Sequence, residues 1–238
     1  MADDTASPTH FSLDGDVAVL TLEDGKANAI GHETLDAFHH AIDRAEADAS
    51  ALVVAGGAKA FSAGYDLAVM TESTESMQGL VAAGARLLMR LFGSTVPTVA
   101  ACTGHALAGG ALTLLACDDR VGPDDAPAKI GLNEVAIGMP LPVFAVELAR
   151  HRLSPRYQTA AVLGAVYAPD KAVAAGYLDQ LVPRAEVVDV AKELALQRSA
   201  LRRGAVGRTK EALRGAMIAQ VLATLDDDIG ALTGPRTD

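Results

Sequence analysis

Short apolar runs alternate with longer stretches of helical periodicity along most of this sequence. The runs at 17–22 (VAVLTL) and 51–56 (ALVVAG) have the length and composition of buried strands, and apolar residues recur at helical spacing over 31–48 between them. A third run, 98–104 (TVAACTG), follows another helical stretch at 77–92. Alternating short strands and helices predict an α/β fold with parallel strands.

After a short strand near Arg120, the rest of the chain is mainly helical in pattern. The predicted helices cover 142–151, 154–163, 169–176, 185–201 and a long C-terminal stretch from about Gly207. Strand-like runs stop near Val182. The sequence therefore predicts a core of residues 1–190 and an appended helical region of residues 191–238.

Composition limits the classes of protein to which the chain can belong. Half of the 238 residues are apolar, yet no apolar run approaches the roughly 18 residues that a membrane span needs. Residues 1–16 carry acids and no apolar stretch, which argues against a secretory leader. Cys102 and Cys117 lie in apolar runs, as buried thiols do in a reducing compartment. These features predict a cytoplasmic protein outside the membrane.

Charge argues against one class of partner. The formal net charge of −10 disfavours nucleic acid, whose binding needs a cationic surface. The segment 198–214 nevertheless carries six cations and one acid, Glu211. Taken alone, such a segment is most often a solvated helix face, although a basic patch can also hold an anionic ligand. The six cations are Arg198, Arg202, Arg203, Arg208, Lys210 and Arg214.

Three familiar kinds of site are disfavoured by spacing. The histidines are scattered and no Cys-x-x-Cys pair occurs, so no metal site is expected. The segment 104–111 has the glycine spacing of a phosphate-binding loop but lacks its Lys and Ser/Thr. The segment 60–64 (AFSAG) approximates the nucleophile elbow of serine hydrolases around Ser62, but nothing ties His105 or His151 to that serine.

Two glycine-bearing turns, at 62–66 and 104–110, follow strand-like runs, and Glu134 stands in an apolar loop. Glycine-rich turns free backbone amides from a sheet, and such amides can stabilise an oxyanion. Gly109 is expected at the start of the apolar helix 110–117, with its N–H at the positive end of the helix dipole. Taken alone, each of these turns is more often a plain turn, but the three features together form a recognisable pattern.

Four segments in order resemble motifs of the enoyl-CoA hydratase/isomerase (crotonase) family, across nearly the whole chain. The segment 26–29 (KANA) resembles the motif whose backbone holds the bent coenzyme A (CoA). The segments 61–67 (FSAGYDL) and 104–110 (GHALAGG) resemble the two segments of the oxyanion hole. The segment 131–140 (GLNEVAIGMP) resembles the one that carries the catalytic glutamate.

This resemblance implies an acyl-CoA enzyme with a crotonase-like ββα spiral core and a C-terminal helical trimerisation region, assembled as a homotrimer or hexamer. Glu134 would be the catalytic acid–base group, and the amides of Tyr65 and Gly109 would hold the thioester oxygen. CoA would be part of the substrate, with no separate cofactor. We expect its phosphates to meet Lys26 and the basic stretch 198–214, either of the same chain or of a neighbouring subunit. The expected substrate-binding residues are Lys26, Ala27, Asn28, Ala63, Gly64, Asp66, Leu67 and Leu112.

One departure from the family pattern bears on the reaction. Hydratases of the family carry a second glutamate three residues after the position of Gly109, and this sequence has Leu112 there. Leucine cannot orient a water molecule, so the pattern is most similar to Δ3,Δ2-enoyl-CoA isomerases of fatty acid metabolism, which use one glutamate. The alternatives are an enoyl-CoA hydratase, another acyl-CoA lyase or hydrolase of the family, and a non-catalytic acyl-CoA binding protein.

Overall fold

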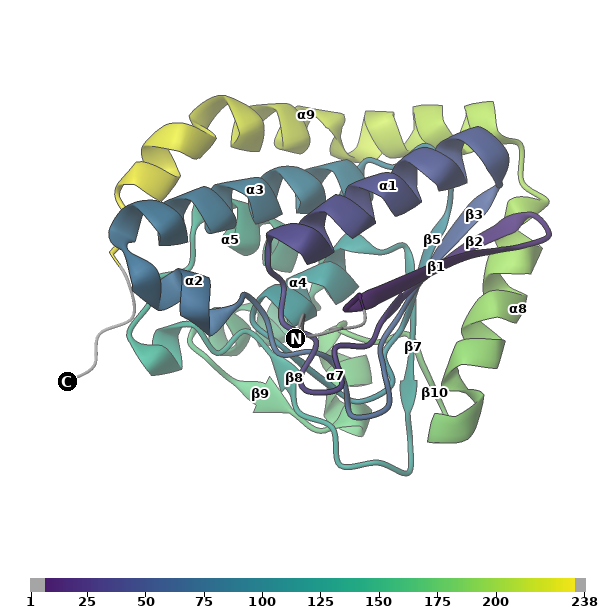
Figure 1. The fold of residues 1–238 in the computed structure, drawn as a ribbon, viewed down its shortest axis with the longest axis horizontal. Coiled ribbons are helices and arrows are strands. Elements are labelled where there is room, and N and C mark those ends of the chain that lie inside the picture. Colours follow the sequence, from purple (N-terminus) through teal and green to yellow (C-terminus); the bar gives the residue numbers. More distant parts are fainter. Residues whose placement is uncertain (1–6, 234–238) are drawn as a thin grey trace, which may run out of the picture.

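A computed structural model describes residues 7–233, which form two sheets with helices packed around them (Figure 1). The strands are β1 (Thr9–Asp14), β2 (Val17–Leu22), β3 (Ala51–Ala55), β4 (Ala60–Ser62), β5 (Thr98–Ala101), β6 (His105–Leu107), β7 (Asp119–Pro123), β8 (Ile130–Gly131), β9 (Val166–Tyr167) and β10 (Gln180–Val182). The α-helices are α1 (His32–Asp48), α2 (Leu67–Glu72), α3 (Thr74–Phe92), α4 (Gly109–Ala116), α5 (Val143–Arg152), α6 (Pro155–Val162), α7 (Pro169–Ala175), α8 (Val187–Ser199) and α9 (Arg203–Gly230). Two short 3-10 helices are η1 (Val135–Ile137) and η2 (Arg184–Glu186).

The larger sheet has the strand order β1-β2-β3-β5-β7-β10, and the smaller has the order β4-β6-β8-β9. The prediction of parallel strands is confirmed from β2 to β10 in the larger sheet. It is wrong at two edges, because β1 pairs antiparallel with β2 and β9 pairs antiparallel with β8. A two-residue turn at Gly15-Asp16, with Gly15 at φ 58°, makes the first of these a hairpin.

The central strands are buried on both faces, which explains their nearly continuous apolar sequence. Leu20 and Val54 face one hydrophobic core, and Val19 and Val53 face the other, as the alternation of side chains along a strand requires. Helix α8 covers the second face, against β2, β3, β5 and β7. The predicted division at residue 190 falls within this helix, and that division stays a prediction.

On the other side of the larger sheet, α3 lies between α1 and α9 (Figure 1). The first half of α9 is tied to the sheet by a buried ion cluster. Asp118, directly before β7, accepts hydrogen bonds from Lys210 Nζ and Arg214 Nη1, both at 2.8 Å. The other end of α9 reaches the cavity described below.

Two expectations concern segments that are not fully described. Residues 1–6, which belong to the segment assessed for a leader, and residues 234–238, which end the predicted helical region, lie outside the described residues. Between them, no helix is both long enough and apolar enough to cross a membrane.

Candidate active site

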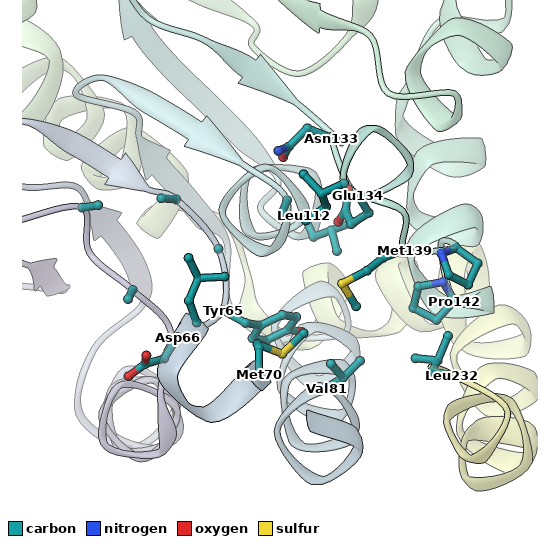
Figure 2. A pocket seen from close by; sticks show the side chains of 18 of the residues that line it. Tyr65, Asp66, Met70, Val81, Leu112, Asn133, Glu134, Met139, Pro142 and Leu232 are labelled. Carbon is teal, nitrogen blue, oxygen red and sulfur yellow. The ribbon is translucent and has the colours of Figure 1, made fainter. Parts of the chain in front are cut away.

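A cavity of about 750 Å³ opens between the loops that follow β2, β4 and β8 and the helices α2, α3, α4 and α5. Its wall comes from the loop 24–29, the segment 63–70, the start of α4, the loop 133–142, and side chains of α3 and α5 (Figure 2). The segments that resemble family motifs therefore converge on one site, although they are far apart in the sequence.

Tyr65 supplies one free backbone amide to this wall. The segment around it pairs in parallel with the segment around Ile30, through Ile30 N to Gly64 O at 2.8 Å and Asp66 N to Ile30 O at 3.1 Å. In such a ladder the residue between the two bonded ones directs its N–H to the opposite side. The Tyr65 amide thus points away from Ile30 and is available to a ligand.

Gly109 supplies the second free backbone amide of the cavity wall. It is the first residue of α4, so its N–H has no acceptor within the helix and stands at the positive end of the helix dipole. The preceding residue, Ala108, adopts the unusual dihedrals φ 48° and ψ −121°. Its N–H donates to Gly131 O at 3.1 Å, which anchors the turn to the segment that carries Glu134.

The two amide-bearing segments are in direct contact. A Cβ built on Gly64 would lie 3.2 Å from Gly109 N and 3.0 Å from Ala108 Cβ. Gly64 also has φ 99°, a conformation that side chains disfavour. Glycine at this position therefore permits both the turn and the close approach that brings the two amides to one place.

Glu134 faces the same cavity from the loop before η1. Ile137 N and Met139 N donate to Glu134 O at 3.1 and 3.0 Å, which fixes the backbone around the glutamate. Its Oε2 is buried and has no hydrogen-bond partner among residues 7–233. Burial raises the pKa of the carboxyl from its ordinary 4.5 to about 7. A group that titrates near neutral pH is suited to taking and returning a proton.

The two other acids that line the cavity, Asp24 and Asp66, accept hydrogen bonds from backbone amides. Asp24 accepts from the backbone amides of Lys26, Asn28 and Ala29 at 2.7–3.1 Å. Burial acts to raise the pKa of Asp24, but these amides outweigh it and hold that pKa below its ordinary value. Asp66 caps α2 by accepting from Ala68 N at 2.8 Å. Within the described residues, no group of three His, Cys, Asp or Glu side chains is placed to hold a metal.

The remaining expected binding residues divide into two groups. The cavity is lined by Lys26, Ala27, Ala63, Gly64, Asp66, Leu67 and Leu112. Asn28, in contrast, is buried outside the lining, with φ 54°. Its amide nitrogen donates to the carbonyl oxygens of Leu22, Ala60 and Phe61, so it ties the loop to β2 and β4.

Ser62 has no role as a nucleophile in this geometry. Its hydroxyl is buried, donates to Asn28 O at 2.7 Å and accepts from Gly64 N at 3.2 Å. His105, one of the histidines considered for it, accepts from Lys129 N through Nδ1. The serine thus stabilises the turn that presents the Tyr65 amide.

The expectation of a basic patch is wrong for two of its six cations. Lys210 and Arg214 are buried and paired with Asp118, and Arg198 pairs with Asp119 at 2.9 Å. The stretch lies near the start of α9, whereas the cavity meets Leu232, just beyond the end of this 28-residue helix. At 1.5 Å per residue, Arg214 lies roughly 24 Å before the end of the helix. None of the six cations is among the residues that line the cavity.

Two polar groups of the cavity residues, which the sequence offers but does not support as a second base, also lack partners among residues 7–233. The hydroxyl of Tyr65 and Oδ1 of Asn133 are both buried without a hydrogen-bond partner in the described part of the chain. Burial, and secondarily the charge of Glu134, raises the pKa of the Tyr65 phenol well above its ordinary value. The sequence did not predict that this phenol packs against Gly84 of α3. A glycine in the middle of a predicted helix was the available signal, since a helix accepts glycine there only at a cost in stability.

The chain is similar to known proteins in both sequence and fold. The family model described as "Enoyl-CoA hydratase/isomerase" matches residues 13–233. Human "Enoyl-CoA delta isomerase 1, mitochondrial" is 29% identical over 218 residues, covering 90% of this chain and 72% of that protein. A "Putative enoyl-CoA hydratase" of Thermus thermophilus is 36% identical over 188 residues, covering 76% and 74% of the two chains. The crystal structure of an enoyl-CoA hydratase/isomerase family protein from Pseudomonas syringae superposes with a TM-score of 0.91, at 38% identity, over 95% and 98% of the chains. The expected crotonase-like fold is therefore confirmed.

Proposed function

The chain belongs to the enoyl-CoA hydratase/isomerase family, and on this basis we propose that it moves the double bond of an enoyl-CoA from the Δ3 to the Δ2 position. Glu134 is the single acid–base group in this proposal. The proposal goes beyond the family assignment, because relatives of similar identity carry the names of isomerases and of hydratases.

One observation carries the choice of reaction. Of the three acids that line the cavity, only Glu134 keeps a buried carboxylate oxygen without a partner in the described structure. One helical turn beyond Gly109, where a second acid would face the first, stands Leu112, which is 1% exposed. A site with one free carboxylate can move a proton between two carbons, but it lacks a second group to position and activate water.

The reaction follows from this arrangement. Glu134, in its charged form, takes a proton from C2 of the substrate, between the thioester and the double bond. The electrons of that C–H bond form a C1–C2 double bond while the carbonyl π electrons move onto the thioester oxygen, where the Tyr65 and Gly109 amides receive the charge. As the carbonyl re-forms, the C1–C2 electrons become the C2–C3 double bond and the electrons of the C3–C4 double bond take up a proton at C4. Losing one such donor costs about 3–4 kcal/mol of transition-state stabilisation in comparable sites. Glu134 then returns the proton to C4, which leaves the double bond conjugated with the thioester.

The polar end of the cavity suits the CoA arm. Among the lining residues, Lys26, Ala27, Ala63 and Leu67 are exposed and Asp66 is half-buried, so they mark the open end of the cavity. Lys26 is the cation we assign to the CoA phosphates within this chain. The proposed working form is a homotrimer or hexamer in the cytoplasm, and CoA enters as part of the substrate.

The test replaces the base while keeping its shape. Glu134→Gln is expected to lower turnover of a 3-enoyl-CoA by about 10²–10⁴-fold, because positioned acid–base catalysis is worth that much. Binding of a saturated acyl-CoA should persist. Glu193→Gln, at an exposed position on α8, is the matched control and should leave the rate unchanged.

Two results would contradict the proposal. If Glu134→Gln keeps more than about a tenth of the wild-type rate, another residue is the base. If the wild-type chain binds acyl-CoA without exchanging C2 protons with solvent, it is a binding protein and not an enzyme.

A further inference from the structure

Beyond the two amides, the residues that line the cavity are apolar. The compartment on the far side of Tyr65 is lined by Met70, Val81, Met139, Pro142, Phe144 and Leu232, none of which is charged. Figure 2 shows Leu232 beside Pro142 and Val81, on the side of the cavity opposite Asp66. The compartment is therefore suited to an apolar chain and unsuited to the phosphates of CoA.

Leu232 reaches this compartment from just beyond α9 and is only 6% exposed. Gln78 of α3 holds the backbone there, because its Nε2 donates to Gly230 O at 3.2 Å and to Leu232 O at 3.1 Å. On the other side, Asp228 accepts from Val143 N, the first residue of α5, at 2.8 Å. The end of α9 is thus fastened to two helices that also form the cavity wall.

We propose that Leu232, held in place by Gln78, is the specificity-determining residue that limits the length of the acyl chain. This inference rests on the proposed acyl-CoA substrate and names its class, which is acyl chains short enough to end at Leu232. A longer chain must displace the leucine from its apolar surroundings, and with it the backbone that Gln78 binds. Both losses oppose binding of the longer chain.

The experiment measures the binding of butyryl-, octanoyl-, dodecanoyl- and hexadecanoyl-CoA by calorimetry. These saturated thioesters lack the double bond, so the measurement does not depend on turnover. Leu232→Ala opens the compartment, and we expect hexadecanoyl-CoA to gain at least about tenfold in affinity relative to butyryl-CoA, because further methylenes leave water. The matched control is Leu213→Ala, on the same helix but 66% exposed, which should leave the four affinities in their wild-type ratios.

A second variant tests the hydrogen bonds that hold the end of α9, without changing a residue that lines the cavity. Gln78→Ala removes both hydrogen bonds to the end of α9, and it should shift the preference toward longer chains in the same direction, by a smaller factor. Gln220→Ala, an exposed glutamine of α9, is its control. Gln78→Ala also decides the matter if Leu232→Ala does not fold.

The outcomes separate the two claims. Unchanged affinity ratios in the folded variants, or an equal shift in the controls, overturn the role of Leu232 while the proposed function stands. Absence of binding of every acyl-CoA to the wild-type chain overturns the proposed function, and this inference with it.

Discussion

The hydroxyl of Tyr65 occupies the space in which a side chain on Gly84 would stand. A Cβ built on Gly84, within α3, would overlap the Tyr65 hydroxyl and the adjoining ring carbons. Glycine inside a helix costs about 0.5–1 kcal/mol relative to alanine. Glycine at position 84 destabilises α3 by this amount, but it leaves the space that the Tyr65 ring fills. The backbone amide of the same tyrosine is one of the two proposed oxyanion donors.

Gly84→Ala is therefore expected to move the Tyr65 ring and its backbone amide. Turnover of a 3-enoyl-CoA should fall by about 10-fold or more, since misplaced oxyanion donors lose much of their effect. Gly79→Ala is the control on the same helix, because a Cβ there meets nothing within 4 Å. A Gly84→Ala enzyme with wild-type kcat would show that the ring does not position the amide.

Tyr65→Phe tests the hydroxyl apart from the backbone. The hydroxyl is buried without a partner in the described structure, so its removal should leave the free energy of unfolding unchanged or raise it by about 1 kcal/mol. Activity should stay within a few fold of wild type, because the amide and not the phenol is the proposed donor. Chemical denaturation and steady-state kinetics measure the two effects. A loss of activity comparable with that of Glu134→Gln would make the phenol part of the chemistry.

The pH dependence of the reaction follows from the raised pKa of Glu134. The base must be charged to take a proton, so kcat/KM for a 3-enoyl-CoA should rise with pH and level off above an inflection near 7. A profile that is already level at pH 5 would mean that Glu134 titrates as an ordinary carboxylate.

The same raised pKa predicts that, whereas kcat/KM rises with pH, the contribution of Glu134 to the stability of the fold falls with pH. The folded chain holds the Glu134 proton more tightly than the unfolded chain, so this group makes the free energy of unfolding fall as pH rises from about 4.5 through about 7. Glu134→Gln should remove that contribution and gain stability relative to wild type at pH 8. Denaturant unfolding at pH 5 and pH 8 measures the difference. Equal pH dependence in the two proteins would contradict the burial of the carboxyl.

The ion cluster under α9 predicts a large loss of stability. Asp118→Ala leaves Lys210 and Arg214 buried without their shared acid, which typically costs ~3–5 kcal/mol. Asp226→Ala, whose partner Arg86 is half exposed, should cost less than about 1 kcal/mol. Urea unfolding at neutral pH compares them. Equal losses in the two variants would show that the buried cluster contributes no more than a surface pair.

The central strands were predictable because both of their faces are buried. Burial on two sides makes β2, β3 and β5 continuous apolar runs, which a sequence displays directly. Strand β1 is largely exposed at the edge of its sheet and has no such run, although Gly15-Asp16 is a recognisable hairpin turn. The smaller sheet is built from strands of two or three residues, which are too short to show a period and exist through their pairing.

The meeting of Tyr65, Gly109 and Glu134 around one cavity was also predictable, because the three lie in motifs whose local order persists in the fold. The apolar compartment of the cavity could not be predicted from the sequence. Val81 lies on α3 and Leu232 just beyond the end of α9, far apart in the sequence, and nothing local marks either as a wall of the cavity. The pairing of Lys210 and Arg214 with Asp118 was hidden for the same reason, since a cation in a helix reads as solvated until its tertiary partner is known.

The most direct test of the account compares two reactions on one enzyme sample. Conversion of a 3-enoyl-CoA to the 2-enoyl-CoA and hydration of crotonyl-CoA are both followed by the absorbance of the conjugated thioester. Among the three acids of residues 7–233 that line the cavity, only Glu134 keeps a buried oxygen without a partner, and Leu112 lines the same cavity. We therefore predict that isomerisation is faster than hydration by about 10²-fold or more. Hydration at a rate equal to or above isomerisation would contradict the account and show that another group supplies the second acid.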